Sequence, residues 1–207
     1  MGIVAGAVKL RRYQVIGEVP ADFRDSFEEA IQHNTFVDFD ADDSRELAVG
    51  WVAVDDLYSS NLFLDRWLVD NTVNLTLRLD TKRVPAQFLK RQCRTLETEW
   101  KLKMGREHLT KAEREEIVEI VSRRLLERVI PATQGHDFSW DLNRGDLLFW
   151  NTGEKANEAF KVLFEQTFNL KLRLLFPFTL ARRALGEGAA AAIEGARPCA
   201  FAVRGGP

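Results

Sequence analysis

A stripe of cations is predicted along one helix in the middle of the chain. Arg94 and Lys101 follow Lys90 by four and eleven residues, and at about 100° per residue these three side chains lie within about 40° of one another. Aligned ammonium and guanidinium groups can bind the phosphates of a nucleic-acid backbone. The same pattern fits a solvated helix face on which Glu97 pairs with Lys101. The residues alone leave both interpretations open.

Charge is distributed unevenly along the chain, although the net charge is only −2 at pH 7. Between Glu18 and Asp70 there are fourteen acidic residues and three Arg, a net charge of −11. Between Lys82 and Arg128 there are thirteen Lys and Arg and eight Glu, a net charge of +5. The first segment would repel a polyanion, so we expect any nucleic-acid surface in the second.

No sequence motif for a metal, a nucleotide or covalent catalysis stands out. The acidic cluster Asp38–Asp43 resembles the opening of a calcium loop, but Asp43 and Val49 stand where such a loop needs Gly and Glu. Cys93 and Cys199 are far apart, which predicts two free thiols. We therefore expect no cofactor, no metal and no enzymatic activity. A metal-dependent DNA exonuclease, with carboxylates drawn from distant parts of the chain, is the alternative.

Two predicted helices carry the candidate cations. Apolar residues recur at helical spacing over 85–104, and Gly105 is a typical residue to end that helix. Thr110 and Glu113 form a capping box, which predicts the start of a second helix. That helix is expected to run to about Ile130, where a proline follows. The charged middle of the chain is thus predicted to be a pair of helices.

Strands and helices alternate on both sides of this pair. Before it, the pattern predicts strands over 7–17 and 46–54, a helix over 20–34, and a hairpin over 63–80 that turns at Asp70 and Asn71. After it, the pattern predicts two strands joined by a turn at 143–145, a helix over 153–169 and a strand over 170–176. Apolar neighbours place Trp51, Trp67 and Trp140 in the core and not on a base-stacking surface.

This order predicts an α+β domain over residues 1–178. It would consist of two strand–helix–strand subunits, 1–80 and 133–178, on either side of the charged helices within 84–130. The Ala- and Gly-rich residues 179–207 predict a flexible tail. No apolar run approaches the roughly 20 residues that span a bilayer, so we expect a cytoplasmic protein that makes no membrane contact.

The chain resembles the recombination-associated protein RdgC family over residues 5–178. Four segments carry the resemblance by their order: "VGWVAVDD", "LTLRLDTKRVPAQFLKRQ", "EWKLKMGREHLTKAEREEIVEIVSRRLLERVIP" and "HDFSWDLNRGDLLFWNTGEKANEAF". In that family a Gly-Trp-Val strand precedes a strand-to-helix segment and a helical stretch rich in Lys, Arg and Glu. A Trp-x-Asp strand, a turn with Gly and a helix containing Lys-Ala follow.

The resemblance implies a bacterial, nucleoid-associated homodimer in the cytoplasm. Such proteins bind double-stranded DNA with little sequence preference and restrain a RecA-type recombinase. By resemblance, the mid-chain helices would belong to a basic inner surface that encircles DNA. Its best candidates are Lys90, Arg94 and Lys101, and its secondary candidates are Lys82, Arg83, Lys103, Lys111, Arg123 and Arg124.

The chain departs from the family at its C-terminal end. Family members continue into a further region that helps to build the ring, whereas this chain has the Ala- and Gly-rich tail. A short homologue would bind DNA as an open dimer or keep the fold for a different partner. A dimeric protein-interaction module without DNA affinity is the remaining alternative.

Overall fold

A computed structural model of the chain describes residues 2–3, 8–40, 43–186 and 195. The described residues form seven strands and six helices, which confirms the predicted α+β class. The strands are β1 (Arg11–Ile16), β2 (Leu47–Val52), β3 (Leu68–Val69), β4 (Thr72–Thr81), β5 (Ala132–Asp141), β6 (Asp146–Phe149) and β7 (Lys171–Leu175). The helices are α1 (Phe23–His33), α2 (Leu64–Trp67), α3 (Ala86–Met104), α4 (Lys111–Leu126), α5 (Glu154–Phe168) and α6 (Pro177–Leu185).

The described strands all belong to one antiparallel sheet. Their order is β2-β4-β5-β6-β1-β7, and the short β3 pairs with the start of β4. Because β1 lies between β6 and β7, Tyr13 on β1 is opposite Leu147 on one side and Leu174 on the other. The N-terminal and C-terminal strand–helix–strand segments therefore share one sheet and do not form two subunits.

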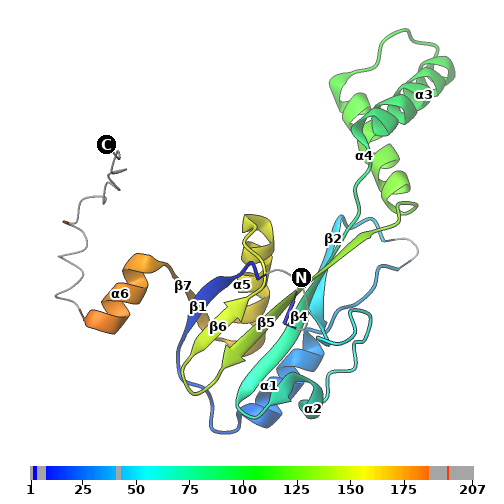
Figure 1. The fold of residues 1–207 in the computed structure, drawn as a ribbon. Coiled ribbons are helices and arrows are strands. Elements are labelled where there is room, and N and C mark those ends of the chain that lie inside the picture. Colours follow the sequence, from blue (N-terminus) through cyan, green and yellow to red (C-terminus); the bar gives the residue numbers. More distant parts are fainter. Residues whose placement is uncertain (1, 4–7, 41–42, 187–194, 196–207) are drawn as a thin grey trace, which may run out of the picture.

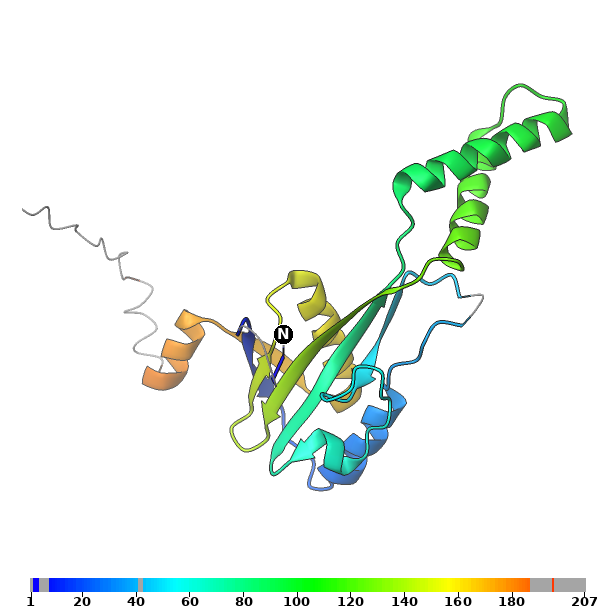
Figure 2. The ribbon, with the colours of Figure 1, turned by 45° about the vertical axis from the view of Figure 1, so that its right-hand side comes forward.

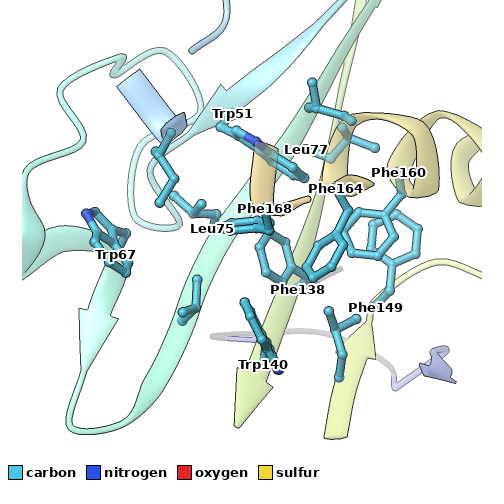
Figure 3. Packing of buried hydrophobic residues seen from close by; sticks show 14 of the residues in the cluster. Trp51, Trp67, Leu75, Leu77, Phe138, Trp140, Phe149, Phe160, Phe164 and Phe168 are labelled. Atoms are coloured by element: carbon cyan, nitrogen blue, oxygen red, sulfur yellow. The ribbon is translucent and has the colours of Figure 1, made fainter. Parts of the chain in front are cut away.

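One face of the sheet is covered by α1 and α5, which lie side by side (Figure 1). Side chains alternate along a strand, so every second residue of β4 and β5 points toward these helices. Phe160, Phe164 and Phe168 of α5 are spaced four residues apart and share one helix face. Figure 3 shows their rings against Phe138 and Trp140 of β5. This aromatic layer joins the helices to the sheet.

The prediction that three Trp residues lie in the core is confirmed. Trp51, Trp67 and Trp140 are fully buried. The indole Nε1 of Trp51 donates a hydrogen bond to Thr167 Oγ1 on α5 at 2.8 Å, and its ring centroid lies 5.2 Å from that of Phe138. Trp51 therefore connects β2, β5 and α5 within the core.

The predicted strand before Asp70 is a helical turn instead. Residues Leu64–Trp67 form α2, and only Leu68 and Val69 pair with β4. A helical turn brings Leu64 and Trp67, three residues apart, to the same side, where both pack on the core. The predicted turn is confirmed, because Asp70 adopts a left-handed φ of 54° between β3 and β4.

α3 and α4 form a helical hairpin that projects from one end of the sheet. β4 and β5 pair along their full lengths, and the hairpin starts where this ladder ends at Thr81 and Ala132. Figures 1 and 2 show the hairpin extending away from α1 and α5. It has a small core of its own, formed by Cys93, Leu109, Ile117 and Val121.

Three of the four predicted boundaries of the two helices are confirmed, the first at Pro85, which directly precedes α3. Gly105 ends α3 in the left-handed conformation with φ of 62°, and Thr110 and Glu113 form the capping box of α4. However, α4 ends at Leu126 and not near Ile130. The residues that follow form a turn, because the chain must change direction to enter β5.

The predicted tail begins with a helix. Proline is favoured in the first turn of a helix because its φ is already helical and the missing N–H has no partner there, and Pro177 begins α6, which runs to Leu185. Arg183 Nη1 of α6 lies 2.5 Å from Asp146 Oδ1 on β6, which holds the helix near the sheet. The other predicted tail residues, 187–194 and 196–207, lie outside the described part of the chain.

Candidate nucleic-acid interface

Three cations line one shallow depression on α3. Lys90, Arg91 and Arg94 surround it together with Gln87, Thr95 and Thr98, and its volume is about 500 Å³. All three cationic side chains are exposed. The hydroxyls of Thr95 and Thr98 donate hydrogen bonds to backbone carbonyls of the same helix. The ammonium and guanidinium groups are therefore the main donors that this depression offers to an anion.

These three charges are not neutralised by neighbouring carboxylates. None of Lys90, Arg91 and Arg94 forms an ion pair with another described residue. A carboxylate partner would have to be displaced before a phosphate could bind. Here that competition does not arise, so the depression is a source of positive potential on α3.

Lys101 lies on the same side of α3 but is half-buried and does not line the depression. The expected ion pair between Glu97 and Lys101 is absent from the described residues. That ion pair is one of the features that the solvated-face interpretation predicts. Among the secondary candidates, Arg83 and Lys103 are exposed.

Two secondary candidates on α4 are engaged with carboxylates. Lys111 Nζ lies 3.7 Å from Glu115, and Arg123 Nη2 lies 3.1 Å from Glu119. Each pair is spaced four residues apart on an exposed helix face, where ion pairs contribute little to stability. Their positive charge is nevertheless compensated locally, so α4 offers less to a polyanion than α3 does.

Lys82 does not lie on this surface. Its side chain is buried, with a residue exposure of 5%. The ammonium Nζ donates a hydrogen bond to the carbonyl oxygen of Asp43 at 2.7 Å and lies 4.3 Å from the ring centroid of Phe39. The expectation that Lys82 contacts a phosphate is therefore corrected, because its ammonium is buried against Asp43 and Phe39.

Two carboxylates of the acidic cluster, those of Asp38 and Asp43, form ion pairs with arginines. Asp43 accepts a hydrogen bond from Arg45 Nε at 2.8 Å, and this contact and one from the Arg45 backbone lower the pKa of Asp43. Asp38 lies 2.9 Å from Arg78 Nη2 on β4. No group of three or more His, Cys, Asp or Glu residues in the described ranges is placed to hold a metal ion. Asp42 lies outside those ranges.

Arg124 lies in a different place from the depression. Together with Arg128 it lines a groove between α3 and α4. Thr95 of α3 borders both this groove and the depression. The structure therefore groups Lys90 with Arg94 and separates Arg124 from them.

Arg91 is a site residue that the sequence analysis missed. It is adjacent to Lys90 and three residues before Arg94, and it lies about 60° from Arg94 around the helix. A search for cations within a stripe about 40° wide therefore excludes Arg91. A search for cations on any exposed side of the helix would have included it.

Comparison with known proteins does not assign the chain to a family: no protein-family model matches it, and no curated protein has a matching sequence. In the part of the chain that the structure describes, no helix is both long enough and apolar enough to cross a membrane.

Proposed function

We propose that the protein binds double-stranded DNA without sequence preference, through the exposed cations of α3. The observation that carries this proposal is the depression of Lys90, Arg91 and Arg94 on a hairpin that projects from the sheet. Phosphates are the recurring anions of duplex DNA, and their contacts with Lys and Arg give affinity without reading the sequence. Arg83, before α3, and Lys103, near the end of α3, are also exposed and would add positive charge to this part of the protein.

The dimensions of the hairpin favour contacts with the DNA backbone over contacts with bases. Two packed helices lie about 8–10 Å apart, and each is about 10 Å wide. The pair is therefore roughly 20 Å across, whereas the major groove is about 12 Å wide. A hairpin of this width lies across the groove and meets phosphates. Binding is expected to depend weakly on sequence for that reason.

The biological part of the proposal rests on the resemblance to the RdgC family. We extend it to a homodimer that acts in DNA recombination and restrains a RecA-type recombinase, in the cytoplasm and on the nucleoid. The projecting basic hairpin is compatible with a surface that faces DNA. A dimer would place two such hairpins on one duplex and multiply the number of phosphate contacts.

Binding to unrelated duplexes over a range of salt concentrations tests the proposed function. Two duplexes of equal length and different sequence should bind with affinities within a few-fold of each other. Both affinities should fall steeply as salt rises, because each neutralised phosphate releases condensed counterions. Absence of binding at low salt, together with a stable dimer in sedimentation, would favour a protein-interaction module. Cleavage of end-labelled DNA in Mg²⁺ would instead favour an exonuclease.

A further inference from the structure

The groove between α3 and α4 has an apolar floor that the proposed DNA contacts do not use. Its volume is about 520 Å³, which is within the range of about 300–1,000 Å³ typical of ligand sites. The floor is formed by Phe88, Leu96, Val121, Leu125 and Val129. Phe88 is 44% exposed, and Ile130, next to the groove in sequence, is 89% exposed. Apolar side chains gathered in one groove, and not scattered singly over the surface, favour a partner.

The rim of the groove carries excess positive charge. Arg124 of α4 and Arg128 in the turn after it both line the groove, and Glu99 is the single acidic residue in the lining. Neither arginine forms an ion pair with any residue that the structure describes. Two like charges that line one groove repel each other. An anionic group bound between them would relieve that repulsion.

We infer that this groove is a docking site for an acidic amphipathic helix of a partner protein. Such a helix has apolar side chains at every third or fourth position for the floor and carboxylates on its flanks for Arg124 and Arg128. The complementarity in charge and in polarity selects this occupant. The inference does not require that α3 bind DNA.

Two other candidate occupants would complement either the arginines or the apolar floor of the groove, but not both. Duplex DNA supplies anions for Arg124 and Arg128 but presents no apolar side chains to Phe88 and Val129. A second copy of this chain supplies an apolar surface, but a symmetric contact uses the same patch on both copies. It would bring the arginines of one copy against those of the other, which opposes association.

The test uses the full chain and a synthetic helical peptide as a fluorescent probe. The peptide carries Leu at helical spacing and Glu on both flanks, and a matched peptide carries Lys in place of Glu. We expect the Glu peptide to bind in fluorescence anisotropy and the Lys peptide to bind at least tenfold more weakly. The double variant Arg124→Glu/Arg128→Glu and the variant Phe88→Ala should each lose at least tenfold in affinity for the Glu peptide.

Controls separate specific docking from general electrostatics and from unfolding. The charge-matched variant Lys155→Glu/Lys171→Glu changes exposed residues of the body and should bind the Glu peptide like the wild type. Circular dichroism should show the same melting curve for every variant used. Equal affinity for both peptides, or unchanged affinity in the groove variants, would overturn the inference. So would absence of binding to the wild type, or self-association in sedimentation that Phe88→Ala abolishes.

Discussion

Arg78 and Asp80 form a buried ion pair on β4, with Arg78 Nη2 2.7 Å from Asp80 Oδ2 and Arg78 Nε 3.0 Å from Oδ1. The Arg78 guanidinium also lies 3.9 Å from the ring centroid of Phe36. The hydrogen bonds to Asp80 are the main reason why the pKa of Arg78 is raised above its ordinary value. Arg78 thereby ties Asp38 to β4, the strand that leads into the hairpin.

Removing the carboxylate of this pair should destabilise the protein strongly. Asp80→Ala would leave the buried Arg78 without its main partner, and breaking one side of a buried pair costs about 3–5 kcal/mol. Chemical denaturation at pH 7 measures this loss. The double variant Arg78→Met/Asp80→Leu should recover a large part of the stability, because it removes both buried charges. A single variant as stable as the wild type would contradict the structural role of the pair.

Tyr13→Phe should reduce stability by about 1–3 kcal/mol, the usual cost of leaving a buried polar atom without its hydrogen bond. The Tyr13 hydroxyl donates to Asn157 Oδ1 on α5 at 2.6 Å, and both residues are buried. Asn157 Nδ2 continues to donate to the Gly153 carbonyl oxygen, so the amide cannot turn to find a new donor without losing that bond. Urea denaturation of wild type and variant measures the difference. The exposed Tyr58, changed to Phe, is the matched control.

Stability should fall as the pH is lowered through the range in which histidine titrates. Burial is the main cause that lowers the pKa of His136, and the neighbouring Asp137 carboxylate acts in the opposite direction. Asn151 Nδ2 lies 2.9 Å from His136 Nε2, and Asn151 Oδ1 accepts from the Gly153 N–H, so the amide presents its donor to a neutral ring. The neutral form of His136 therefore belongs to the folded state.

The direction of the pH effect follows from the lower pKa of His136 in the folded chain than in the unfolded chain. Below a pH of about 6.5, His136 in the unfolded chain binds a proton, whereas in the folded chain it stays neutral until a lower pH. The unfolded state then binds more protons, and the free energy of unfolding decreases as pH falls. Melting temperatures at pH 7.5 and 5.5 should differ less in His136→Gln than in the wild type. The exposed control His33→Gln should behave like the wild type, and an equal pH response in all three would contradict the prediction.

Local patterns in the sequence predicted most of the elements, because helices depend on contacts between near neighbours. Gly105 and the capping box of Thr110 and Glu113 mark hairpin boundaries without reference to the rest of the chain. The position of β1 between β6 and β7 could not be predicted in this way. Tyr13 pairs with residues more than 130 positions away, and no local signal selects those partners.

In the candidate site, too, some residues could be predicted from local patterns and others depend on long-range contacts. The exposed Lys90 and Arg94 could be found from helical spacing alone. The burial of Lys82 depends on Phe39 and Asp43, which lie far from it in the sequence, so a count of cations along the sequence includes it wrongly. Residues 63–69 look like a strand because Phe63, Leu64, Trp67, Leu68 and Val69 outnumber the two charged residues among them, and only packing against the core selects a helical turn at 64–67.

The central claim is that Lys90, Arg91 and Arg94 bind phosphates of duplex DNA. The variant Lys90→Glu/Arg91→Glu/Arg94→Glu removes the three cations of the depression. Its matched control, Lys155→Glu/Lys171→Glu/Arg173→Glu, makes the same change in net charge at exposed positions of the body.

Duplex affinity should be measured by fluorescence anisotropy at several salt concentrations for the wild type, the depression variant and the control. The slope of log K against log salt is negative, and each lost phosphate contact makes it less steep by about 0.9. The account predicts that the slope of the depression variant is shallower than that of the wild type by about 2.7, while the control keeps the wild-type slope. Equal slopes in the depression variant and the wild type would contradict the account.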